Sequence, residues 1–97
     1  MNLGQTISER RKSLGLAQGE LAQRLGVTQT YMSLIERDKK KPTVHLLEKI
    51  ASELNMPLPL LFFFSLEKSD ISPDKKQIYD RHYDHLKDVL KQFIDED

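Results

Sequence analysis

Apolar residues recur at spacings of three and four along most of the chain, which is the period of an amphipathic helix. Glycines, prolines and threonines divide this pattern into short pieces. The pieces predict five helices, over about residues 3–14, 18–25, 29–36, 44–54 and 57–66. Their apolar faces are expected to include Leu3, Ile7, Leu14, Leu21, Ala22, Leu25, Met32, Ile35, Val44, Leu47, Ile50, Ala51 and Leu54. No alternating pattern typical of a strand is present, so the predicted fold class is all-α.

The last third of the chain has a different pattern. The polar stretch 67–74 has no periodicity and is predicted to be a linker. Residues 75–97 are predicted to form one further amphipathic helix, so that the domain before the linker spans 1–66. The apolar seam of this helix is of coiled-coil type, with four-three spacing, and consists of Tyr79, Tyr83, Leu86, Leu90 and Phe93.

The composition narrows the class of protein. The 97 residues contain no cysteine, which excludes a disulfide framework and a thiolate zinc site. The longest apolar stretch, 56–64, is far shorter than the roughly 20 residues that a membrane span needs. The first residues lack the apolar centre of a signal peptide. A soluble, cytoplasmic protein with no membrane association is therefore expected.

The net charge of zero hides an uneven distribution. Residues 1–56 carry 9 lysines and arginines against 6 acidic residues, whereas residues 57–97 carry 6 against 9. The basic residues 1–56 suit a polyanionic partner such as DNA, whereas the acidic residues 57–97 are expected to have a role other than DNA binding. The uneven charge alone is weak evidence for DNA binding, but a motif in the basic half points to the same partner.

That motif is QGELAQRLGVTQTYMSLIE, over residues 18–36. It predicts two short helices joined by a tight turn, with Gly26 supplying the positive φ of the turn and Ala22 allowing close approach of the helices. Thr28 can cap the second of them. In such a unit the second helix lies in the major groove, about 12 Å wide, and the first braces it across the backbone.

With LAQRLGV at 21–27, IER at 35–37 and the turn at Pro42, the sequence resembles the phage repressor and Cro class of helix-turn-helix domains. This class, also called the xenobiotic-response-element type, is a standard example of major-groove docking. The resemblance covers about residues 3–66. It implies a five-helix DNA-binding domain, here followed by an additional C-terminal helix, in a prokaryotic or phage-encoded protein.

The resemblance implies which side chains read bases. Gln29 matches an adenine reader, because a glutamine amide can donate to and accept from the adenine edge. Thr30, Ser33 and Leu34 share its face of the helix. Leu34 has two interpretations: contact with a thymine methyl group, or packing in the wedge between the two helices.

The resemblance also implies phosphate contacts and one structural pair. The residues at phosphate-contacting positions are Gln18, Thr28, Arg37, Lys39, Lys40 and Lys41. Gln18 is in addition expected to buttress Gln29. Arg11 and Glu36 match a salt bridge that ties the first helix to the third.

Two positions depart from the family pattern. Ala17 replaces the usual serine or threonine cap, which predicts a weak start of the second helix. Asp38 replaces the usual glycine after the recognition helix. It would adopt the left-handed conformation less readily and would place a negative charge beside the phosphate path.

The apolar stretch 58–64 contains more large side chains than one short helix can bury against a single domain. The surplus is expected to be covered by the last helix, by a second subunit or by both. A homodimer is predicted, and its expected interface consists of Leu60, Phe63, Phe64, Tyr79, Tyr83, Leu86, Leu90 and Phe93.

The function expected from these observations is sequence-specific binding of double-stranded DNA by a transcriptional regulator, a homodimeric repressor that reads a two-fold operator. The alternative is a protein-interaction regulator of antitoxin type, whose apolar surface and last helix bind a partner protein. No nucleophile and base are combined in a catalytic pattern, so an enzyme is not expected. His82 and His85 lack further convergent ligands, and no metal, cofactor or small-molecule substrate is expected.

Overall fold

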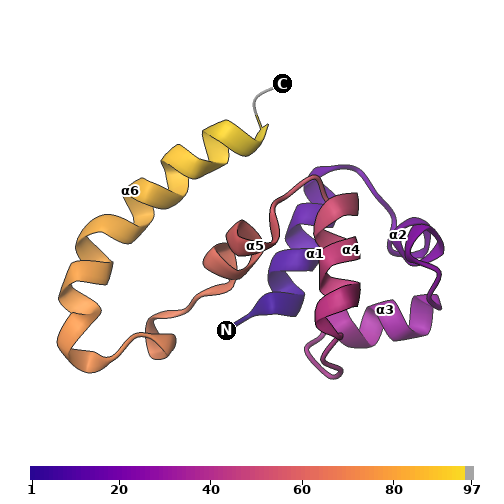
Figure 1. Cartoon of the computed structure of the whole chain (residues 1–97), viewed down its shortest axis with the longest axis horizontal. Helices are drawn as coiled ribbons and strands as arrows, with labels where there is room; N and C mark the ends of the chain where they lie inside the picture. Colours follow the sequence, from indigo (N-terminus) through magenta and orange to yellow (C-terminus); the bar gives the residue numbers. More distant parts are fainter. Residues whose placement is uncertain (96–97) are drawn as a thin grey trace.

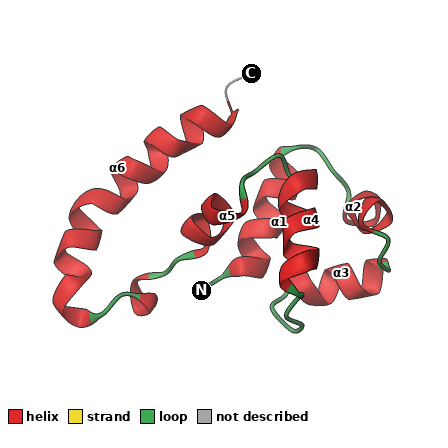
Figure 2. Cartoon of the chain, viewed as in Figure 1, coloured by secondary structure: helices red, strands yellow, loops and turns green. Residues whose placement is uncertain are grey.

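The computed structural model describes residues 1–95, apart from the side chains at positions 78, 79, 81, 82 and 93–95. The helices are α1 (Leu3–Ser13), α2 (Gln18–Leu25), α3 (Gln29–Glu36), α4 (Val44–Glu53), α5 (Leu58–Ser65) and α6 (Lys76–Asp95). Two single-turn 3-10 helices, η1 (Lys68–Asp70) and η2 (Pro73–Lys75), lie in and after the polar stretch. The described residues contain no strand (Figure 2), which confirms the all-α fold.

The first four helices end in the same way. After each, one residue takes a left-handed conformation, namely Gly15, Gly26, Asp38 and Asn55, with φ between 52° and 72°. At Gly26, its N–H donates to the Gln23 carbonyl at 3.1 Å and the next N–H donates to the Ala22 carbonyl at 3.0 Å. These two bonds satisfy carbonyls that the helix end leaves free. They also produce the sharp turn into α3.

Side chains cap the starts of two helices. The hydroxyl oxygens of Thr28 and Thr43 accept backbone N–H bonds at 3.0 and 3.1 Å, and the first of these caps was predicted. Ala17 has no capping side chain, but its N–H donates to the Glu20 carboxylate at 3.1 Å. This bond is one half of a capping box, and it supports the start of α2 that the sequence indicated to be weak.

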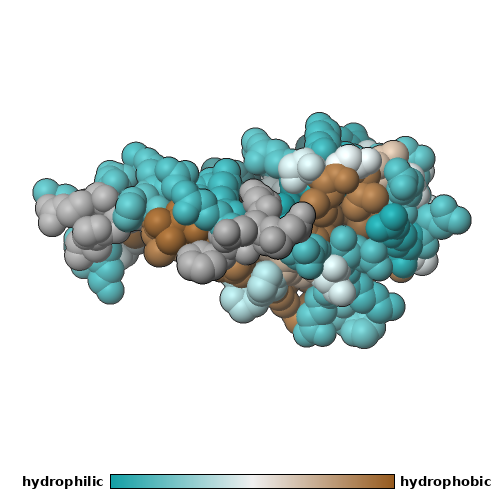
Figure 3. Space-filling view, turned by 90° about the horizontal axis from the view of Figure 1, so that it is seen from above, coloured by the Kyte–Doolittle hydropathy of each residue, from teal (hydrophilic) through white to brown (hydrophobic). Residues whose placement is uncertain are grey.

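The core lies among α1–α5, where α1 packs against α3 and α5, and α2 packs against α3 and α4. The buried apolar residues are Ile7, Leu21, Ala22, Leu25, Met32, Ile35, Leu47, Ile50, Ala51, Leu54, Met56, Leu61 and Phe64. The predicted burial of two residues is wrong, because Leu14 is 41% exposed and Val44 is 64% exposed. Both lie at helix ends, where the chain turns away from the core. Viewed from above, hydrophobic residues form separate patches among hydrophilic ones (Figure 3).

Helix α6 lies at the opposite end of the molecule from α2 and α3 (Figure 1). The Tyr83 hydroxyl donates to the Phe63 carbonyl at 3.3 Å, and the two rings lie 5.1 Å apart between centroids. Leu90 packs against the core. The last helix of the same chain therefore covers part of the aromatic surplus on α5. No helix in the described part of the chain is long and apolar enough to span a bilayer.

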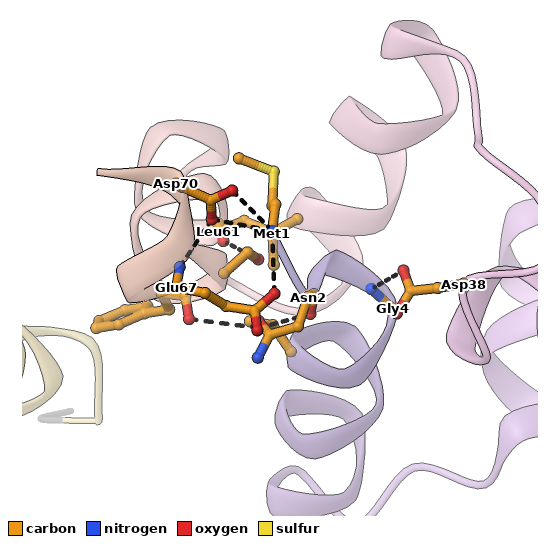
Figure 4. Close-up of polar contacts among 10 residues, drawn as sticks. Met1, Asn2, Gly4, Asp38, Leu61, Glu67 and Asp70 are labelled. Carbon is orange, nitrogen blue, oxygen red and sulfur yellow. Dashed lines mark hydrogen bonds and ion pairs between the residues drawn. The ribbon is translucent and has the colours of Figure 1, made fainter. Parts of the chain in front are cut away.

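The polar stretch 67–74 contacts the N-terminus through ion pairs (Figure 4). The Met1 ammonium lies 3.0 Å from a Glu67 carboxylate oxygen and 2.9 Å from one of Asp70. Hydrogen bonding to Asp70 and then Glu67 raises the pKa of this ammonium group. The pKa of Asp70 is lowered, chiefly because its carboxylate accepts the Glu67 N–H. The sequence offered no signal for these contacts between residues about 70 positions apart.

Candidate nucleic-acid interface

Helix α3 presents one face to the core and the other to solvent. Met32 and Ile35 are buried, at 0% and 1% exposure. Gln29 and Thr30 are exposed at the start of the helix, and Ser33 is half-buried one turn further on. The tight turn at Gly26 sets α3 across α2, so that its first turn projects from the domain (Figure 1). This arrangement is the one that major-groove docking needs.

Leu34 is half-buried and belongs neither to the buried core nor to the partly buried hydrophobic residues that pack against it. Its side chain therefore lies on the flank of α3 between the core face and the exposed face. This position favours contact with a ligand over a role as a wedge between the helices, and the thymine contact stays a prediction.

The Gln29 side chain lies against the start of α2. Its carbonyl oxygen, Oε1, is 3.2 Å from the point that a Cβ on Gly19 would occupy. The Gln18 amide is turned elsewhere, because its Nε2 donates to the Glu36 carboxylate at 3.2 Å. The expectation that Gln18 buttresses Gln29 is corrected accordingly. A hydrogen bond to a carboxylate is stronger than one between two neutral amides.

Arg11 and Glu36 form a two-pronged ion pair between α1 and α3. The Arg11 Nε and Nη2 atoms donate to the two Glu36 oxygens at 2.7 and 2.9 Å, and both residues are buried, at 7% and 8% exposure. The Arg11 Nη1 atom donates to the Leu16 carbonyl at 2.8 Å. Hydrogen bonding to Glu36 raises the pKa of Arg11, so the guanidinium keeps its charge.

Five of the six residues at phosphate-contacting positions are exposed, and Gln18 is half-buried. Lys39, Lys40 and Lys41 lie in the loop between α3 and α4. Within the described residues no carboxylate forms an ion pair with any of the three. The Arg37 Nε donates to the Ser33 carbonyl at 3.3 Å, which holds this guanidinium at the end of α3. The loop thus carries three unpaired cations beside the exposed face of α3.

The Asp38 carboxylate is hydrogen-bonded to the start of α1. Its Oδ1 accepts the Gly4 N–H at 2.9 Å, which directs the carboxylate to the start of α1 (Figure 4). There it meets the positive end of that helix. Asp38 adopts the left-handed conformation with φ 58°. Asp38 also lines a pocket together with Lys40 and Lys41, so the negative charge expected beside the phosphate path stays a prediction.

Gly4 is the residue that sequence reasoning missed. A Cβ at this position would lie 2.7 Å from the Glu36 carbonyl oxygen, and it would also collide with the Ile35 carbonyl oxygen. The first turn of α1 therefore touches the last turn of α3 directly, backbone against backbone. The only signal in the sequence is a glycine inside a predicted helix, which usually marks weakness.

The described residues contain no group of three or more histidine, aspartate or glutamate side chains that could hold a metal ion. His82 lies outside the described side chains, as do Tyr79 and Phe93 of the predicted dimer interface. The exposed face of α3 carries the amide of Gln29 and the hydroxyls of Thr30 and Ser33, and the loop after it carries lysines. Such groups suit recognition of base edges and phosphates.

Comparison with known proteins agrees with this geometry. A family model described as helix-turn-helix matches residues 7–61. The HTH-type transcriptional regulator SinR of Bacillus subtilis is 37% identical over 60 residues, which are 61% of this chain and 54% of SinR. The ImmF control region 10 kDa protein of Bacillus phage phi105 is 39% identical over 59 residues, 61% of this chain and 66% of that protein. The match thus spans about half the length of SinR.

Two solved structures are also similar. A crystal structure of SinR, the master regulator for biofilm formation, in complex with DNA has a TM-score of 0.58 and 36% identity, covering 62% of this chain and 97% of that one. A chain of the SinR–SinI protein complex has a TM-score of 0.58 and 30% identity, covering 96% of this chain and 91% of that one.

Proposed function

The chain belongs to the helix-turn-helix family, as its resemblance to the phage repressor and Cro class predicted, and from this premise we propose that it is a sequence-specific regulator of transcription. It binds double-stranded DNA with α3 in the major groove and acts as a homodimeric repressor at a two-fold operator. The observation that carries the proposal is the exposed first turn of α3, with Gln29 set against α2.

The polar groups divide into two roles. Gln29, Thr30 and Ser33, with Leu34 beside them, reach base edges and confer sequence preference. Gln18, Thr28, Arg37 and the lysine loop 39–41 contact phosphates and set affinity and orientation. The unpaired lysines support this role, since they bring no carboxylate to the DNA surface.

Replacing Gln29 by alanine is expected to weaken binding to a selected operator by about 1–3 kcal/mol and to leave binding to random duplexes nearly unchanged. The physical reason is loss of a two-pronged contact that only one base offers. Titration of labelled duplexes, after selection of an operator from a random pool, measures both affinities. Gln23→Ala, an exposed glutamine on α2, is the matched control and should change neither. An equal loss on selected and random DNA would remove Gln29 from base reading.

Changing Lys39, Lys40 and Lys41 together to glutamine should weaken binding to all duplexes alike. Each lost phosphate contact should reduce the slope of log affinity against log salt by about 0.9. The comparison is a salt titration of both proteins on selected and random DNA. The control changes Lys75 and Lys76, which are exposed before and at the start of α6. An unchanged salt slope in the loop variant would show that these lysines do not contact DNA.

The dimer proposal rests on a smaller surface than the sequence indicated. Phe64 is 8% exposed in its own core, and Phe63 and Leu90 already pack within the chain. Contacts within the chain account for these three side chains without a second subunit. Leu60 is half-buried, and Leu86, on α6, is the most exposed of the described residues in the predicted interface, at 45%. We propose that this face of α6 joins two copies.

Leu86→Asp should then shift the protein from dimer to monomer in light scattering at micromolar concentration, because the substitution places a charge in an apolar contact. Val44→Asp, at an even more accessible apolar position at the start of α4, is the control and should leave the molar mass unchanged. A wild-type chain that stays monomeric at high micromolar concentration would contradict the homodimer.

The second candidate function is regulation through a partner protein that binds the same surface. It is favoured by the likeness of 96% of this chain to a chain of the SinR–SinI complex. In that case the face of α6 with Leu86 would bind another polypeptide in place of a second copy. A monomeric wild-type chain that still binds the operator would favour this candidate over the homodimer.

A further inference from the structure

A pocket of about 180 Å³ lies between α6 and the first five helices, and none of its described lining residues belongs to α3. Its lining comes from α1, from the turn between α4 and α5, from α5 and from α6. Met56 and Phe64, which are 7% and 8% exposed, supply its apolar part. An engineered cavity of about 150 Å³ is enough to hold benzene, so this pocket can take a molecule of one ring.

Two lysines of α6 stand at this pocket. Lys87 and Lys91 are four residues apart, which places them one helical turn from each other on the same face. The Lys87 ammonium lies over the Tyr83 ring, 5.6 Å from its centre, so the ring holds this side chain at the pocket. Among the side chains that the structure describes, no carboxylate pairs with either lysine.

The α1 side of the pocket adds a fixed cation. The Arg10 Nε donates to the Leu54 carbonyl at 3.0 Å, which anchors this guanidinium at the end of α4. Glu9 is the acidic residue in the lining, and its carboxylate accepts a hydrogen bond from the Gln5 amide at 3.1 Å. Arg10 has further contacts, so the cations that stand without a carboxylate partner among the described lining residues are the two lysines of α6, beside an apolar wall.

We propose that this pocket binds a small organic anion with an apolar body, of the size and chemistry of a benzoate ion. Its ring would pack on Met56 and Phe64, and its carboxylate would lie between Lys87 and Lys91. Partial exclusion of water strengthens such charge-assisted bonds. A ligand held by α1 and α6 together would fix α6 on the domain. Such a ligand would act on the position of the last helix, at a site whose described lining includes no residue of α3.

The test is a titration of the full ¹⁵N-labelled chain, followed by amide chemical shifts, with benzoate and with its neutral isostere benzamide. Benzoate at millimolar concentration should give saturable shifts of the amides of Thr6, Ser13 and Phe64. Benzamide should bind about tenfold more weakly, the factor that corresponds to about 1.4 kcal/mol. The double variant Lys87→Gln, Lys91→Gln should lose affinity for benzoate by a similar factor.

The double variant Lys75→Gln, Lys76→Gln removes the same charge outside the pocket and should bind benzoate as the wild type does. The amide spectrum of each variant shows directly that it is folded. Equal binding of benzoate and benzamide would overturn the anion site. Shifts that do not saturate, or an equal loss in both double variants, would overturn it as well.

Discussion

Arg11→Ala is expected to lower the free energy of unfolding by about 3–5 kcal/mol, because it leaves the Glu36 carboxylate buried without its partner. Glu36 is 8% exposed, and Arg11 donates to both of its oxygens. The Leu16 carbonyl loses a donor in the same variant. The one remaining donor to Glu36 from a side chain is the Gln18 amide, which is neutral. Denaturant unfolding followed by circular dichroism measures the change.

Arg24→Ala is the matched control. Its guanidinium lies 3.7 Å from the Glu53 carboxylate, and the Arg24 side chain is 50% exposed. A pair of this kind contributes about 0–1 kcal/mol. If the two variants unfold at the same denaturant concentration, the Arg11–Glu36 pair does not hold α1 to α3.

Gly4→Ala is expected to destabilise the fold by about 3 kcal/mol, at the upper end of the usual cost of overpacking. The new Cβ would meet the Ile35 and Glu36 carbonyl oxygens, which are backbone atoms and cannot rotate away. The first turn of α1 must then move away from α3, and the bond from the Gly4 N–H to Asp38 is stretched. Thermal unfolding monitored by circular dichroism should show a clearly lower midpoint.

Gly19→Ala provides the comparison, since Gly19 is also the second residue of its helix. A Cβ there would meet only the end of the flexible Gln29 side chain, at 3.2 Å. Alanine should therefore keep or raise stability, by up to about 1 kcal/mol from helix propensity. Opposite signs for the two glycines are the expected result. A tolerated Gly4→Ala would mean that α1 and α3 are not in direct backbone contact.

The helices were predictable where the signal is local. The turn at Gly26 and the caps at Thr28 and Thr43 depend on residues within four positions of one another, and the structure has all three. The contact of Gly4 with Asp38 joins positions 34 apart and leaves no periodic trace. The partner of the Asp38 carboxylate could not be predicted, because aspartate seldom adopts the left-handed conformation and the sequence does not show that the Gly4 N–H lies nearby.

The candidate site was predictable only in part, and for a different reason. Residue spacing alone separates Met32 and Ile35 from the exposed side of α3. The assignment of Gln29 to base reading and the pairing of Arg11 with Glu36 came from the family resemblance. The Gln18 amide could donate either to Glu36 or to Gln29, and the sequence does not decide between them. In the structure its Nε2 donates to Glu36.

The claim that Gln29 reads an adenine in the major groove is tested most directly by changing one atom of the DNA. Each adenine of the selected operator is replaced in turn by 7-deazaadenine, which lacks the N7 acceptor, and wild type and Gln29→Ala are titrated on every duplex. The account predicts one position per half-site at which the wild type loses affinity by about 1 kcal/mol or more and the variant loses none. Equal losses for both proteins at every adenine would contradict it.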